Sequence, residues 1–278
     1  MIQNLEPEKE LARIGAIQDD DFNPLSAALL VASLMRPGLK VGPYTRHMKK
    51  LSLDIFRYVN NDPANTPLTL RVEALTQVVF RRYGYRGRVG IEYDPDGADL
   101  ARVIDARSGC SEALTLIVVN LADSLGWTAT PIYLPGRVLV RLEHEGERQI
   151  LDPFTGNPKV SAHSLRKIAK TCEKQNRGFK ITKVVELKNR ELLDHLLVLH
   201  KKLLLNQSRP KEALMLIEAC LLLEPKNAIL WQECGVLHAH LDQVDSAVNA
   251  LEKSLCFENT ESSHYKTSIV LQELRSRT

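Results

Sequence analysis

The last third of the chain repeats itself with a period of 34 residues. Sliding the sequence by 34 positions aligns Leu197 with Trp231, Ala213 with Ala247, Ile217 with Leu251, and Cys220 with Ser254. Large residues therefore recur at large positions and small residues at small positions. A short repeat of this kind buries its apolar face only by stacking on its neighbours, which restricts the segment to an array of paired helices.

The positions of this repeat match those of the tetratricopeptide repeat. Ala213, Ala247 and Gly235 stand where paired helices approach closely, and Trp231 stands at a large core position. Two positions depart from the pattern, Lys201 and Asn259. We expect five helices in this region, packed on the preceding domain because so short an array needs its ends covered.

The patterning before the repeats divides the chain further. Apolar residues at helical spacing predict helices at about 26–35, 44–59 and 68–83. Beyond Gly84 the sequence predicts both helices and strands. Asp99 caps a short helix, and a buried helix follows at 111–125. Strands are predicted at 128–134, 138–142 and 149–152, with a polar turn at 143–148 between the last two. A helix at 161–172 and a strand at 179–185 follow. The prediction is an α+β chain with a helical region at 1–83, a mixed core at 84–187 and a repeat region at 188–278.

Composition excludes several classes of protein. The chain has 37 basic and 34 acidic residues, so its net charge of +3 gives no case for nucleic acid as a partner. Two basic clusters lie at 46–50 and 81–88. The second interleaves tyrosines, as some nucleic-acid binders do, and is interpreted as a solvated helix end. Five widely spaced cysteines without a CxxC motif argue against a disulfide framework or a zinc site. With no signal peptide and no membrane span in the sequence, we expect a cytoplasmic protein without metal or cofactor.

One cysteine stands where chemistry is possible. Cys110 follows Gly109 directly and precedes the buried helix, and a helix N-terminus carries a partial positive charge that favours a thiolate. Downstream, two strands lead to Asp152. A cysteine at a helix start followed by strands that carry His and Asp is the layout of transglutaminases and related papain-like folds. Two interpretations stay open: Cys110 is a nucleophile, or a small buried residue at a tight helix start.

Three segments together resemble the bacterial SirB-one family: YDP-(x)4-LARVIDARSG at 93–109, PGRVLVR at 135–141 and LDPFTG at 151–156, followed by the repeats. The resemblance covers nearly the whole chain. It implies a helical N-terminal region, a transglutaminase-like core with a small antiparallel sheet, and a short tetratricopeptide-type array. Many members carry histidine where this chain has Arg137, and many lack a cysteine at the position of Cys110.

Arginine at this position removes the general base, because a guanidinium is not deprotonated at usable pH. Arg137 and Asp152 lie on one face of the hairpin as diagonal neighbours if the turn centres on 145–146, so they can form an ion pair. His144 is the nearest histidine and is expected in an exposed turn. Glu112 is a candidate carboxylate of the helix cap and the cleft.

The sequence thus favours a catalytically degenerate transglutaminase-like protein that acts through its cleft and repeat helices on a protein or peptide partner. The alternative is a cysteine-dependent acyl-transfer enzyme, a protease, deamidase or amide hydrolase, with Cys110 as nucleophile and Asp152 in support. The missing base argues against the enzyme.

Overall fold

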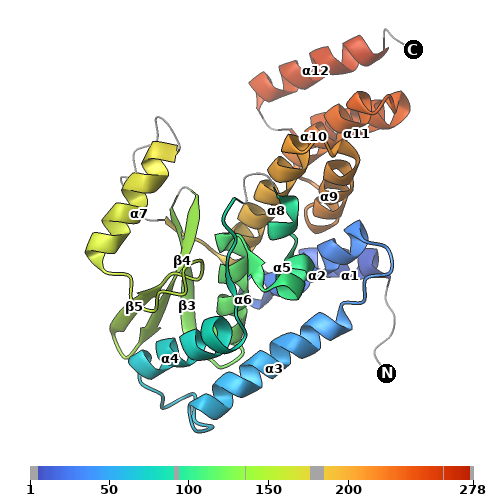
Figure 1. Ribbon diagram of the computed structural model, residues 1–278. Helices are drawn as coiled ribbons and strands as arrows, with labels where there is room; N and C mark the ends of the chain where they lie inside the picture. Colours follow the sequence, from blue (N-terminus) through green and yellow to red (C-terminus); the bar gives the residue numbers. More distant parts are fainter. Residues whose placement is uncertain (1–5, 91–93, 135, 176–184, 259, 276–278) are drawn as a thin grey trace. The chain divides into compact units, whose positions relative to one another are not determined.

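A computed structural model describes the chain except residues 1–5, 91–93, 135, 176–184, 259 and 276–278 (Figure 1). The chain forms two compact units. One contains residues 1–18, 30–39 and 201–278, and the other contains 19–29 and 40–200. Helices α2 (Pro24–Met35) and α8 (Asn189–Asn206) contribute residues to both. The three-part division made from the sequence stays a prediction.

The larger unit begins with helices whose apolar spacing predicted them. α3 (Gly42–Tyr58) buries Met48, Leu51 and Ile55 at helical spacing. α4 (Leu68–Leu75) continues into a wider π-helical turn, η2 (Thr76–Arg82). Helix α6 (Ser111–Asp123) follows, and nearly every residue along it is buried, as its all-round apolar sequence predicted. It contacts α3, β3 and β4, so it is the central helix of this unit.

A four-stranded antiparallel sheet packs against α6. Its strands are β3 (Thr128–Leu134), β4 (Arg137–His144), β5 (Glu147–Leu151) and β6 (Val185–Glu186), in the order β5-β4-β3-β6. Along β4, Val138, Val140 and Leu142 are buried and alternate with residues of the opposite face. On that face Leu139 packs with Ile132 and with residues of α7 (Ala162–Gln175), which lies beside the sheet (Figure 1). The sheet therefore has helices on two sides.

The β4–β5 turn is shorter than the sequence indicated. Glu143 pairs with Arg148 and His144 with Glu147 in the strand ladder, which leaves Glu145-Gly146 as a two-residue turn. Both turn residues have positive φ, 48° and 81°, as a type I′ hairpin requires. Of the predicted strand at 179–185, only Val185 lies within the described residues, at the start of β6.

The smaller unit is helical. Its helices after α8 are α9 (Pro210–Leu223), α10 (Ala228–His240), α11 (Val244–Phe257) and α12 (Glu261–Arg275), each packed on the next, and α1 (Pro7–Gly15) packs on α9. Gly235 lets α10 and α11 approach closely, because an added Cβ would lie 2.6 Å from Cγ of Leu251. Ala247 and Leu251 also pack with Leu271 and Leu274 of α12. In the described part of the chain, no helix has the length and apolar character needed to cross a membrane.

Candidate functional site

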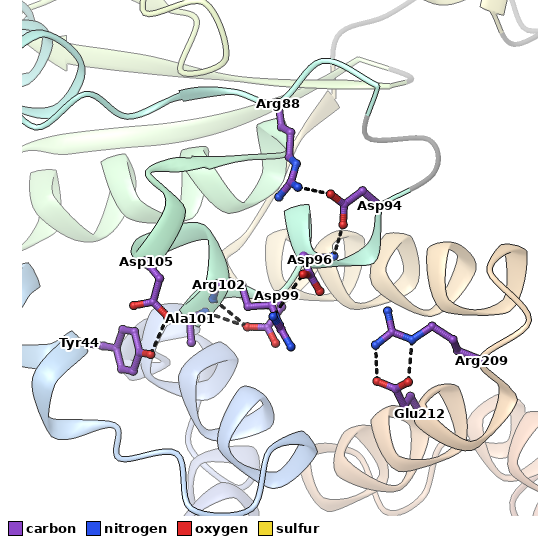
Figure 2. Close-up of polar contacts among 10 residues, drawn as sticks. All are labelled: Tyr44, Arg88, Asp94, Asp96, Asp99, Ala101, Arg102, Asp105, Arg209 and Glu212. Atoms are coloured by element: carbon purple, nitrogen blue, oxygen red, sulfur yellow. Dashed lines mark hydrogen bonds and ion pairs between the residues drawn. The ribbon is translucent and has the colours of Figure 1, made fainter.

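A series of short capped elements positions Cys110. Asp94 caps the short helix η4 (Pro95–Gly97), accepting a hydrogen bond from the Asp96 N–H at 3.0 Å, and also pairs with Arg88. Asp99 caps α5 (Leu100–Ala106), as predicted, by accepting from the N–H groups of Ala101 and Arg102 (Figure 2). The left-handed Arg107, with φ 54°, then ends α5. These turns bring the chain to the start of α6.

Strand β2 (Ser108–Gly109) follows, beside the parallel strand β1 (Arg86–Gly87). Gly109 fits tightly, because an added Cβ would lie 2.5 Å from a methyl carbon of Val103. The Cys110 N–H donates to the carbonyl of Gly97 at 2.8 Å. The residue before α6 is thus fixed through its backbone.

Cys110 is the N-cap of α6, and its thiol is buried. Only 2% of the residue is exposed. Its Sγ accepts a hydrogen bond from the N–H of Ala113 at 3.4 Å. Burial raises the pKa of the thiol well above its ordinary value, and the negative charge of Glu112 raises it further. Hydrogen bonds from backbone N–H groups of the helix lower the pKa of the thiol, but burial and Glu112 outweigh them. Cys110 is therefore a neutral thiol at neutral pH.

The first turn of α6 is joined to the start of β4. The Ser111 hydroxyl accepts from the N–H of Val138 at 3.1 Å and donates to the Glu112 carboxylate at 3.0 Å. Thr115 donates to the carbonyl of Val138. Glu112 is 7% exposed, and its carboxylate is engaged by the neighbouring serine. The fold thus brings the segments that hold Cys110 and Arg137 together.

Arg137 and Asp152 do not pair, so the predicted ion pair is wrong. Leu151 lies opposite Val140 in the ladder of β4 and β5. Extending this ladder by one residue places Asp152 diagonal to Arg137, as expected. However, the carboxylate of Asp152, 2% exposed, accepts from the Phe154 N–H at 3.0 Å and from the Thr155 hydroxyl at 2.9 Å. The Arg137 guanidinium carbon lies 3.9 Å from the centroid of the Phe154 ring. Asp152 therefore stabilises its own turn, and Arg137 stacks on the ring that this turn presents.

The chain is similar to known proteins over much of its length. The family model described as the transglutaminase-like superfamily matches residues 43–198, more than half of the chain. The chain belongs to this superfamily. A UPF0162 protein from Xylella fastidiosa (strain Temecula1) is 31% identical over 56% of this chain and 54% of its own length. UPF0162 protein YchA of Escherichia coli K12 is 25% identical over 66% of this chain and 69% of its own length.

Protein SirB1 of Salmonella typhimurium is 25% identical over 62% of this chain and 64% of its own length. These relatives confirm the predicted resemblance to the SirB-one family. The matched segment spans about half the length of the Xylella proteins.

Two polar clusters in the transglutaminase-like region were not predicted. In the first, Nη1 of Arg107 lies 2.7 Å from both the Tyr85 hydroxyl and Nε2 of His47. Burial raises the pKa of Tyr85 to about 12 and lowers that of His47 to about 4. The helix ends at Arg82, and Arg81, Arg82 and Arg86 are exposed, as the interpretation of 81–88 as a solvated helix end predicted. Tyr85, however, is only 1% exposed. A tyrosine two residues after the end of an apolar helix was the signal available in the sequence.

The second cluster corrects the placement of His144. This residue is half-buried at the end of β4, and its Nε2 lies 3.2 Å from Nη2 of Arg71. Arg71 is only 4% exposed. A single charged residue in an apolar helix normally indicates an exposed position. The sequence therefore gave no clear signal that Arg71 is buried.

The predicted repeat residues lie in the smaller unit as follows. Ala213, Ala247 and Gly235 are buried where helices pack. Trp231 is not enclosed in the core as predicted. It is half-buried, donates to the carbonyl of Pro225 at 2.8 Å, and carries the Lys253 ammonium 4.3 Å from its ring centroid. Of the cysteines in this unit, Cys220 and Cys234 are buried and Cys256 is exposed.

Trp231 lines a groove of about 630 Å³ between α9, α10 and α11. Its other lining residues combine apolar and polar groups and include Leu221, Leu222, His238, Asp245, Ser246 and Asn249.

Proposed function

We propose that this chain is a non-catalytic transglutaminase-like protein that binds a protein or peptide partner. The observation that carries the proposal is the state of Cys110. A catalytic thiol needs an accessible thiolate and a base. Cys110 is buried, its pKa is raised, and its Sγ serves as a helix cap.

Among the described residues around Cys110, no histidine replaces the missing base. The N–H of Cys110 donates to the Gly97 carbonyl, and its Sγ accepts from the Ala113 N–H. The Glu112 carboxylate also contacts the thiol and raises its pKa, and no histidine is among the partners that the structure describes. Arg137 stands at the position of the family histidine and cannot accept a proton. Both carboxylate oxygens of Asp152 are engaged within their own turn. Of the Cys-His-Asp triad, the histidine is thus replaced by Arg137, while Cys110 and Asp152 form hydrogen bonds that hold the fold.

The partner site in this proposal is the groove of the smaller unit, formed by tetratricopeptide-type helices. α9 and α11 begin at Pro210 and Val244, and they end at Leu223 and Phe257, each 34 residues apart. This spacing supports a repeat array. The groove offers apolar side chains such as Leu221 and Leu222, the ring of Trp231 and the ammonium of Lys253. These features suit a peptide segment with an apolar anchor and a polar flank. The proposal includes a cytoplasmic location, in line with the free thiols of Cys110, Cys220, Cys234 and Cys256.

Capture of partners by the biotinylated full-length protein tests this function. Asn249 is exposed and lines the groove, so N249R is expected to reduce capture at least tenfold by filling it. Q272R adds the same charge at an exposed position of α12 outside the groove and is the matched control. C110S, which retains a cap, should capture as the wild type does. Loss of capture in C110S together with full capture by N249R would overturn the proposal in favour of chemistry at the thiol.

A further inference from the structure

Helix α3 presents a row of cations to solvent. Its apolar residues are buried in the core of the larger unit, so the opposite side of the helix is exposed. Spacings of three, four and seven residues place the exposed cations of α3 together on that side, with Leu53, which is 54% exposed, between them. These cations are Arg46, Lys49, Lys50 and Arg57.

An aspartate joins this row to the second basic cluster of the sequence. Asp54 is 7% exposed, and its carboxylate accepts from the Tyr83 hydroxyl at 2.7 Å. The same carboxylate lies 3.7 Å from Arg57 of α3 and 3.5 Å from Arg82 of η2, which packs against α3. One carboxylate thus holds two guanidinium groups from different elements and balances only one of their charges.

His47 joins the two clusters at a second point. Its Nε2 lies 2.7 Å from Nη1 of Arg107. Burial lowers the pKa of His47 most, and the positive charges of Arg107 and Lys50 lower it further, so both cations lie near its ring. The carbonyl of Arg107 accepts from the N–H of Arg86 in β1 at 3.0 Å. The cations of α3, η2 and β1 therefore belong to one surface, which we call the basic surface.

The basic surface is more positive than the chain as a whole. Its arginines outside α3 are Arg81, Arg82, Arg86 and Arg107. The acidic residues that border it are Asp54, Glu73 and Asp105, which accept hydrogen bonds from tyrosines. Eight basic residues against these three acidic ones leave a net charge of +5, whereas the whole chain carries +3. The low net charge of the chain thus conceals a surface that attracts polyanions.

The side chains on this surface favour a single nucleic-acid strand among polyanions. From Arg46 to Arg57 the row extends over about 16 Å of helix, which is long enough to follow a strand. Leu53 and Tyr58, 54% and 39% exposed, add apolar surface beside the cations. A single strand presents both phosphates and unstacked base faces, and cations with exposed rings or apolar groups bind it without sequence preference.

A membrane and a duplex match this surface less well. A helix that lies on a bilayer buries an apolar face in it, and that face of α3 is already buried in the core. A duplex keeps its base faces stacked inside, where Leu53 and Tyr58 do not reach them.

We propose that the basic surface binds single-stranded nucleic acid, its cations on the phosphates and Leu53 and Tyr58 against base faces. The residues of this surface are not those of the groove in the smaller unit, and this inference does not depend on the proposed function.

Fluorescence anisotropy of a labelled oligo-dT of about 15 nucleotides tests this binding with the full-length protein. R46E/K50E reverses two exposed charges four residues apart on α3, and is expected to weaken binding at least tenfold. R166E/K170E makes the same two changes at the same spacing at exposed positions of α7 and is the matched control, which should bind within twofold of the wild type. Circular dichroism verifies the fold of both variants.

The dependence on salt tests whether phosphates are contacted. The logarithm of the binding constant should fall linearly with the logarithm of the salt concentration, and the slope for R46E/K50E should be smaller in magnitude by about 1.4, because each lost contact to a single strand contributes about 0.7. An unchanged slope would contradict contact of Arg46 and Lys50 with phosphates.

Three other polyanions test the choice of partner. A base-paired duplex of the same length, vesicles that contain phosphatidylserine, and polyglutamate should each bind at least fivefold more weakly than oligo-dT. The proposal is overturned if oligo-dT does not bind saturably at low salt, if R46E/K50E binds it as the wild type does, or if both double variants lose binding equally. Binding of any of the three other polyanions as tightly as oligo-dT would also overturn it.

Discussion

The stability of the fold is expected to depend on pH through one half-buried residue, His47. His47 is half-buried beside Tyr85 and Arg107, and burial is the largest cause of its lowered pKa of about 4, followed by the positive charges of Arg107 and Lys50. An unfolded histidine has a pKa of about 6.5. Between these values, the unfolded chain binds a proton that the folded chain does not. The stability that neutral His47 contributes is therefore fully present above about pH 6.5 and is lost as the pH falls toward 4.

This residue-scale prediction is tested by urea unfolding from pH 7.5 to 4.5. The free energy of unfolding of the wild type should fall as the pH is lowered across this range. The free energy of unfolding of H47Q should fall less steeply. H240Q replaces an exposed histidine of α10 and is the control. An H47Q profile parallel to that of the wild type would show that His47 is not the group responsible.

Residue roles were harder to predict than residue positions. The sequence correctly placed Cys110 at the start of α6 and Asp152 diagonal to Arg137. The pairing failed because a local partner is always within reach: Asp152 bonds to Phe154 and Thr155, two and three residues away. An aromatic ring near Arg137 then gave its guanidinium a stacking partner.

At the scale of elements, close helix contacts depend on small residues. Gly235→Ala would place a methyl group 2.6 Å from Leu251 Cγ and 3.2 Å from the carbonyl of Ala247. We expect α10 and α11 to separate slightly, at a cost of about 1–3 kcal/mol measured by urea unfolding. Gly42→Ala is the matched control, because its methyl group would meet only the flexible end of Arg46 at 3.4 Å. Equal midpoints for both variants would contradict this account of the contact.

The helices and strands were largely predictable where the apolar residues of a segment follow one period, that of a helix or that of a strand. The all-round apolar run of α6 and the alternation along β4 leave few alternatives. The hairpin turn was predicted too long, because Glu143, His144, Glu147 and Arg148 are polar and yet belong to strands. A strand end with an exposed face carries the same residue types as a loop, so composition alone does not separate them.

For the whole molecule, the sequence predicted an α+β chain with a transglutaminase-like core, and both the family match and the sheet agree. The two polar clusters were missed because each joins segments distant in the chain. Arg107 reaches His47 across 60 residues, and Arg71 reaches His144 across 73. No local pattern encodes such contacts. The compact units are likewise discontinuous in sequence.

The central claim is that the thiol of Cys110 holds a helix start and performs no chemistry. Iodoacetamide labelling of the native protein, followed by peptide mass spectrometry, tests it with an internal standard, because Cys256 is exposed. Between pH 7 and 8, Cys256 should be alkylated readily while Cys110 stays unmodified, and both should react in urea. Alkylation of Cys110 in the folded protein at pH 7, at the rate of Cys256 or faster, would contradict the claim.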